Sequence, residues 1–456
     1  MLFRSDCGPG GRLPKILRDV GVEVEFTPLD PDGFDELIFP DLRFRVPASL
    51  ELYRQRLLDA FPAEKRGIDR YVRALREVRI LGRADAPRGW KLAWEAVTRG
   101  RLAAWYKGAT LGAFLDTCTK DQRLRAVIAG QSGDYGVAPG RVSLMLHCGL
   151  VNHYLDGAWY PKGGGQVIAD GLGDVVEAAG GSIHLRHAVT GIVVEGGRAA
   201  GVRWRGPHGE EGRLSAPIVV SNADLKRTWL ELLPSDVGTP EQRARAQGWE
   251  MGGAIFLTCM AVRADLGALG MRNTNYWQFD DYDFDALYAE GARGGIPPIR
   301  GCYITSATRK DPDSPGHAPP GIETVEVMAM TPGSAKAWGV DPADLHYRKA
   351  EAYLARKAEI EANLVGRLER LFPGSTREIV HLESATPITH SRFTGASDGS
   401  GYGLAATPAQ FLENRPGTRG PVPGLYFAGG NTRSGHGIIG ALVSGTHAAR
   451  AISKDA

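Results

Sequence analysis

The residue types and spacing best suited to chemistry lie in residues 423–442, which read PGLYFAGGNTRSGHGIIGAL. An apolar run over 425–428 predicts a buried strand, and the glycine pair that follows allows a tight turn because no Cβ is in the way. A Gly-His-Gly triplet at 435–437 then opens a predicted helix, whose start presents unpaired N–H groups and a positive dipole end. Such a start would stabilise the negative charge on the N1 and C2 oxygen edge of a reduced flavin. Strand, turn and helix can also follow one another for packing reasons alone.

Two further motifs precede this stretch. Residues 160–165 read YPKGGG, and they lead through a predicted helix and several strands to 219–224, which read VVSNAD. Residues 386–390, TPITH, continue towards 401–404, GYGL. The inner face of the final helix is predicted to carry Ile438, Leu442, Gly445, Ala449 and Ile452.

Together, these three motifs resemble the FAD-binding segments of the phytoene desaturase, carotene isomerase and retinol saturase group of flavoproteins, within the amine-oxidase superfamily. The resemblance covers most of residues 20–452 in the order that the family uses. It implies an α/β fold: a Rossmann-like FAD-binding domain of the glutathione-reductase and amine-oxidase type, with an inserted substrate domain of mixed sheet and helices. It also implies FAD-dependent hydride transfer on an apolar, carotenoid-like or retinoid-like polyene, as in carotenoid biosynthesis.

The resemblance also assigns roles to residues. By family position, Tyr402 and His436 are the polar groups that would approach a reacting substrate, and no acid–base triad is expected. The main chain at Val189 would contact the adenine of FAD. The other predicted cofactor residues would lie beside the ribityl, pyrophosphate and isoalloxazine parts: Gly429, Gly430, Asn431, Gly435, His436, Gly437 and Ile438.

Two departures from the family pattern affect these expectations. Many members carry an acidic residue where this chain has Gly430, so a ribityl contact is lost or replaced by Asn431. The Gly-rich strand–turn–helix unit that opens the family's FAD-binding domain is not found, because residues 6–11 follow no apolar strand and Pro14 stands where the helix would form. We therefore expect a fragment without its first βαβ unit, which would bind FAD weakly or not at all.

The predicted elements divide the chain into five parts. Residues 1–21 are a remnant of the N-terminal FAD-binding segment, and 22–158 are a largely helical substrate or cap region. Residues 159–225 and 385–456 are the middle and C-terminal parts of the FAD-binding domain, and 226–384 are the substrate domain. Strands are predicted at 182–185, 189–195 and 199–205, with Gly196-Gly197 as a hairpin turn; the apolar run over 218–221 predicts a buried parallel strand.

Composition narrows the class of protein. Of the 456 residues, 43% are hydrophobic and 23% charged, and the net charge of +2 offers no field for collecting nucleic acid. Five widely spaced cysteines favour a reducing cytoplasm over a disulfide framework. His184 and His187 are expected at the surface, and His147 and His153 are expected to pack at a helix end, so no metal site is predicted.

Residues 88–107 combine basic side chains with Trp90 and Trp94 at helical spacing. A helix of this kind suits peripheral contact with a membrane, here its inner face, from which a lipid-soluble polyene could enter. An amphipathic helix packed on its own domain is the alternative.

The residues do not separate desaturation, saturation and isomerisation. An amine-oxidase-like flavoprotein with a small substrate, and a truncated fragment that binds apolar ligands or a membrane without turnover, also stay open. Oligomeric state is not predicted.

Overall fold

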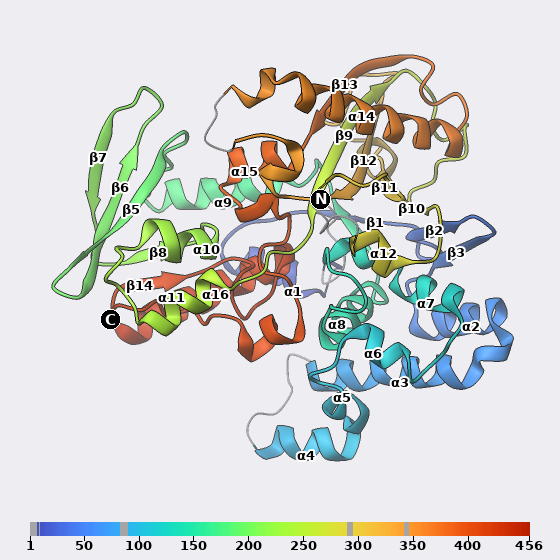
Figure 1. Cartoon of the computed structure of the whole chain (residues 1–456), viewed down its shortest axis with the longest axis horizontal. Coiled ribbons are helices and arrows are strands. Elements are labelled where there is room, and N and C mark those ends of the chain that lie inside the picture. The colour runs from blue at the N-terminus through green and yellow to red at the C-terminus, as the bar shows by residue number, and fades with distance from the viewer. Residues whose placement is uncertain (1–6, 9, 83–89, 290–294, 342–345) are drawn as a thin grey trace.

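The computed structural model describes residues 7–8, 10–82, 90–289, 295–341 and 346–456. Its largest sheet has seven strands in the order β13-β9-β12-β11-β10-β2-β3 (Figure 1). All neighbours are antiparallel except β10 and β2, which are parallel. The strands are β2 (Asp35–Phe39), β3 (Leu42–Val46), β9 (Ala254–Val262), β10 (Asn275–Phe279), β11 (Gly301–Thr305), β12 (Glu323–Thr331) and β13 (Ile379–Ala385). Residues 22–158 and 226–384 therefore share one sheet.

Three smaller sheets complete the strands. A hairpin sheet contains β5 (Ala188–Glu195), β6 (Arg198–Arg205) and β7 (Glu211–Ser215), and it confirms the predicted turn at Gly196-Gly197. The parallel pair β8 (Val219–Ser221) and β14 (Leu425–Phe427) joins the second motif to the C-terminal one. The short strands β1 (Phe26–Pro28) and β4 (Trp159–Pro161) pair antiparallel.

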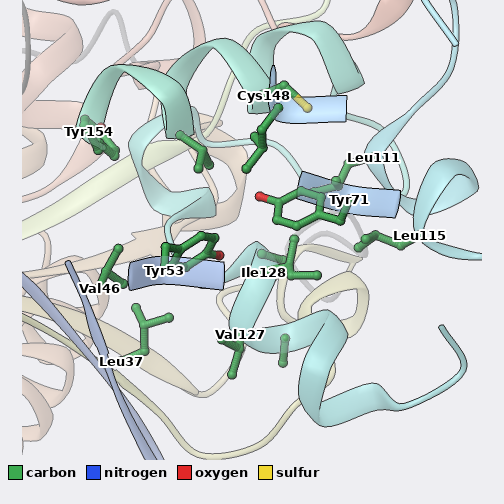
Figure 2. Packing of buried hydrophobic residues seen from close by; sticks show 14 of the residues in the cluster. Leu37, Val46, Tyr53, Tyr71, Leu111, Leu115, Val127, Ile128, Cys148 and Tyr154 are labelled. Carbon is green, nitrogen blue, oxygen red and sulfur yellow. The ribbon is translucent and has the colours of Figure 1, made fainter. Parts of the chain in front are cut away.

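Helices make up most of the described residues between 50 and 154, as predicted, and they pack beside the β2–β3 end of the large sheet (Figure 1). Figure 2 shows Tyr53 and Tyr71 between Cys148 of α8 and Val127 and Ile128 of α7. The helices here are α2 (Leu50–Ala60), α3 (Lys65–Gly82), α4 (Trp90–Arg99), α5 (Arg101–Trp105), α6 (Leu111–Leu115), α7 (Gln122–Ala129) and α8 (Leu144–Tyr154).

The remaining helices surround the sheets. The long α14 (Glu351–Leu371) packs against β9 and β12, whose apolar positions on that side form a second core. The others are α1 (Arg12–Asp19), α9 (Gln166–Ala178), α10 (Leu225–Arg227), α11 (Pro240–Gln247), α12 (Phe284–Ala289), α13 (Ala307–Lys310), α15 (Pro387–Thr394) and α16 (Gly437–Asp455). Of the described helices, none has the length and apolarity needed to cross a bilayer.

Two sequence predictions about strands are wrong. Residues 182–185 form no strand, because Arg186 turns the chain with a φ of 59° and leaves Leu185 78% exposed instead of paired. Strand β8 is parallel as predicted but only partly buried, since Val220 is 44% exposed.

Candidate active site

A cavity of about 700 Å³ lies on one face of the seven-stranded sheet. Its floor is formed by side chains of β9, β10, β11 and β12, and α15 and the start of α16 border it. Ile438, Tyr402 and Gly165 all line it, and each comes from a different sequence motif. The three motifs, separated by up to 280 residues in the chain, therefore meet at one cavity.

The start of α16 is open towards its surroundings. His436 is the N-cap residue and its side chain makes no capping hydrogen bond. Gly435 and Gly437 have φ values of 85° and 81°, and a Cβ built on either would meet no described atom within 4 Å. There is thus open space beside the start of the helix. The predicted contact of its amides with a flavin stays a prediction.

The turn after β14 is held by close contacts with other parts of the chain. Gly429 has a φ of 93°, and a Cβ there would lie 2.1 Å from Oδ1 of Asn222. Its amide donates to Oγ of Ser444 at 2.6 Å, which fixes the turn against α16. A Cβ at Gly430 would lie 3.1 Å from Cα of His436. Packing within the protein therefore requires glycine at 429, while at 430 a side chain would be tightly placed against His436.

Asn431 is engaged with the third motif. Its Oδ1 accepts a hydrogen bond from the amide of Leu404 at 2.8 Å, and a Cβ at Gly403 would lie 1.9 Å from that oxygen. The oxygen therefore holds the 401–404 segment in place. A ribityl contact by Asn431, which the sequence suggests as a replacement for the missing acid, stays a prediction.

Tyr402 and His436, the two polar candidates, lie together, with ring centroids 5.5 Å apart. Both ring nitrogens of His436 are shielded from solvent, and no described residue forms a hydrogen bond with them. Burial, reinforced by the positive charge of Arg415, lowers the pKa of His436 to about 3. The imidazole is therefore neutral near pH 7 and can offer a hydrogen bond to a ligand but no proton from an imidazolium.

Arg415 was not found by sequence reasoning. It is 1% exposed and donates to three backbone carbonyls, those of Leu404, Gln410 and Gly430. Among the residues that the structure describes, no carboxylate pairs with it, and burial lowers its pKa to about 10. An arginine beside proline in a loop gives no sequence signal for this role.

The remaining predicted residues lie elsewhere. Val189 is 43% exposed on β5 and does not line the cavity. His147 is buried between the hydroxyls of Tyr71 and Tyr135. His184 and His187 are exposed, and no group of three potential metal ligands occurs within the described ranges.

Comparison with known proteins shows what the chain is similar to. Residues 297–453 match the model of the flavin containing amine oxidoreductase family. The chain is an FAD-dependent oxidoreductase. The all-trans-retinol 13,14-reductase of Danio rerio is 27% identical over 89% of this chain and 70% of that protein. The neurosporene-forming phytoene desaturase of Cereibacter sphaeroides is 27% identical over 97% and 84%.

The relatives confirm the resemblance stated from the sequence motifs, and they include an isomerase: the chloroplastic prolycopene isomerase of Arabidopsis thaliana is 24% identical over 99% of this chain and 73% of that protein. Solved structures agree on the fold. An oxidoreductase from Methanosarcina mazei superposes with a TM-score of 0.60 at 18% identity, covering 99% of this chain and 86% of that one. A putrescine oxidase variant gives 0.58 at 12% identity, covering 99% and 87%. The predicted α/β fold class is confirmed.

The residues at the start of this oxidoreductase's α16 fit the isoalloxazine end of FAD. A Cβ at Gly435 or Gly437 would meet no described atom within 4 Å, the His436 ring nitrogens lack a described partner, and the next residue, Ile438, lines the cavity. The expectation of weak FAD binding stays a prediction.

Proposed function

We propose that the protein transfers a hydride between FAD and a polyene isoprenoid, in a desaturation, saturation or isomerisation. The observation that carries this proposal is the cavity that runs from the start of α16 along the sheet, because its floor is mainly apolar: Ile255, Leu257, Trp277, Phe279, Met328 and Met330 all line it. A long apolar chain gains free energy there by leaving water, whereas a small polar amine would not. The printed names of the relatives, a retinol reductase, a prolycopene isomerase and phytoene desaturases, point to the same substrate class.

The chain's own residues have defined tasks in this proposal. FAD, when bound, supplies the hydride acceptor or donor. Amides at the start of α16 would stabilise negative charge on the flavin, and Ile438 would separate the ring from the cavity. Tyr402 and the neutral His436 would position the substrate, and the apolar walls exclude water.

We further propose that residues 159–225 and 385–456 form the FAD-binding part, with Val189 towards the adenine. Residues 22–158 and 226–384 then form the substrate part, whose shared sheet carries the cavity floor.

We also propose peripheral contact with the inner face of a membrane through α4 and α5, with the protein in the cytoplasm. Trp90, Trp94 and Trp105 are 75%, 66% and 83% exposed, an unusual amount of uncovered aromatic surface. The two helices project from the lower end of the molecule in Figure 1. Lys91 and Arg101 add positive charge, while the acid Glu95 is engaged by Arg99. Exposed tryptophans within a basic segment match an anionic lipid surface.

The enzymatic proposal is tested with FAD-loaded protein under anaerobic conditions. Phytoene, retinol and putrescine are supplied in separate reactions, the flavin absorbance near 450 nm is followed, and the products are identified by mass. Saturation is tested with dithionite-reduced protein, and isomerisation by product retention time. Turnover of a polyene alone supports the proposal, whereas turnover of putrescine alone, or of none of the three, refutes it.

A further inference from the structure

The sheet face that forms the cavity floor changes from apolar to charged along its strands. On β12, Met330, Met328 and Glu326 alternate with the buried Ala329 and Val327, so the first three face the cavity. Strand pairing places Met330 beside Ile255 and Met328 beside Leu257 on β9. One step further along, Glu326 pairs with Thr305 of β11. An apolar floor thus ends in a carboxylate.

Two more polar side chains, those of Lys310 and Tyr160, line the same cavity as Glu326. Lys310, 2% exposed, follows β11 through α13, and its Nζ lies 5.3 Å from the ring centroid of Tyr160. Burial raises the pKa of Tyr160 to about 12, with further contributions from Glu326 and Asp311. The Tyr160 hydroxyl is therefore protonated and can donate. All of these side chains line the cavity except Asp311.

Two hydroxyl groups of the cavity wall have hydrogen-bond partners within the protein. Ser132 accepts from Tyr288, and Thr305 donates to Asn275. By contrast, no hydrogen bond to the Glu326 carboxylate occurs anywhere in the part of the chain that the structure describes. A carboxylate in a largely apolar cavity is costly unless a donor reaches it. The ligand is a natural source of that donor.

The polar end lies far from the flavin side. Ile255, at the opposite end of the floor, would be 3.2 Å from a Cβ on Gly401, which adjoins Tyr402. Glu326 lies four positions before Met330 along β12, a distance of about 13 Å along an extended strand. A substrate that spans the floor thus places one end at the flavin side and the other at Glu326.

We propose that Glu326, with Lys310 and Tyr160, binds a hydroxyl group at the end of an otherwise apolar polyene, about 13 Å from the reacting bond. A hydroxyl can donate to the Glu326 carboxylate and accept from Lys310 or Tyr160. A hydrocarbon end leaves the carboxylate unmatched, and a carboxylate end is repelled by Glu326. This inference rests on the proposed polyene substrate and adds to it the chemistry of the end group.

Binding can be measured without flavin turnover, by quenching of tryptophan fluorescence, since Trp277 lines the cavity. The probes are all-trans-retinol, its deoxy hydrocarbon analogue and all-trans-retinoic acid. The native protein is expected to bind the alcohol about tenfold more tightly than either of the others, the effect of one well-made hydrogen bond to a charged group. The variants are Glu326→Leu, Glu326→Gln and, as a matched control on the same strand face, Met328→Leu.

In Glu326→Leu the affinity for the alcohol is expected to fall towards that for the hydrocarbon, because only the donors Lys310 and Tyr160 remain. The affinity for the hydrocarbon is expected not to weaken. In the isosteric Glu326→Gln, retinoic acid is expected to gain affinity because the repulsion is gone. Met328→Leu should change the affinities for the three probes by the same factor. Equal binding of alcohol and hydrocarbon by the native protein, or an equal loss of both in the Glu326 variants, would overturn this inference alone. If the native protein bound none of the three, the inference and the proposed function would both fall.

Discussion

Nη1 of Arg415 lies 2.5 Å from the carbonyl oxygen of Gly430, directly behind the turn that leads into α16. The same guanidinium bonds the carbonyl of Leu404, so a single buried cation joins the third motif to the C-terminal one. Its five donors in a planar fork suit several acceptors at once, which a lysine cannot match.

Replacing Arg415 with methionine is expected to lower the free energy of unfolding by about 3 kcal/mol, since three buried carbonyls lose their donor. Arg415→Lys should lower the free energy of unfolding by less, because lysine keeps the charge and can make one or two of the hydrogen bonds. The midpoint of urea unfolding measures both. Arg419→Met is the control, because this exposed arginine donates to the carboxylate of Asp455, which also accepts from the hydroxyl of Tyr426. Equal midpoints for Arg415→Met and the native protein would contradict the role given to Arg415.

The stability of the protein should fall in mild acid because of buried neutral histidines. Burial lowers the pKa of His147 from 6.5 to about 3. The unfolded chain therefore binds a proton below pH 6.5 that the folded protein does not. His147 thus costs no stability above pH 6.5, and stability is lost by about 1.4 kcal/mol per pH unit between 6.5 and 3. His436, with the same shift, adds a similar slope.

The contribution of His147 is isolated by urea unfolding of His147→Gln at pH 7 and pH 5. The variant is expected to lose less stability than the native protein between these two pH values. His381→Gln, at a histidine whose side chain is 66% exposed, should behave like the native protein. An unchanged pH slope in His147→Gln would show that this histidine is protonated in the folded state.

Membrane contact through α4 and α5 predicts a graded response to tryptophan removal. Trp94→Ala and Trp105→Ala should each weaken co-sedimentation with phosphatidylglycerol vesicles about tenfold, because burying a large apolar side chain contributes about 1.5–3 kcal/mol. High salt should weaken binding further. Leu214→Ala, at an apolar residue 59% exposed on β7, is the control. Native protein that stays in the supernatant would remove the membrane proposal.

Local patterns in the sequence predicted much of the fold. The glycine pair at 196–197 indicated the β5–β6 hairpin, and the apolar run before Gly429 indicated β14. The parallel pairing of β2 with β10 was not predictable, because its partners are about 240 residues apart and neither strand carries a mark of the other. For the same reason, no local pattern indicated that residues 22–158 and 226–384 share a sheet.

The site was predicted in part. The segment that opens α16 was found because glycine spacing is a local signal. Asn431 and Arg415 bind backbone groups of the loops around 401–404 and 410, and such contacts depend on the folded arrangement. Glu326 had an overlooked signal: it is an acid at an alternating position of a strand whose equivalent neighbours are methionines.

The most direct test of the account is a titration of FAD with the protein, followed by quenching of flavin fluorescence, for the native chain, Gly437→Val and Gly445→Ala. A side chain at Gly437, whose φ is 81°, would distort the start of α16 and fill the space beside it, whereas Gly445 lies within the helix with no described atom within 4 Å of a Cβ. We expect native and Gly445→Ala to bind FAD alike and Gly437→Val to bind at least about tenfold more weakly. Equal affinity in all three would contradict the placement of the flavin at this helix.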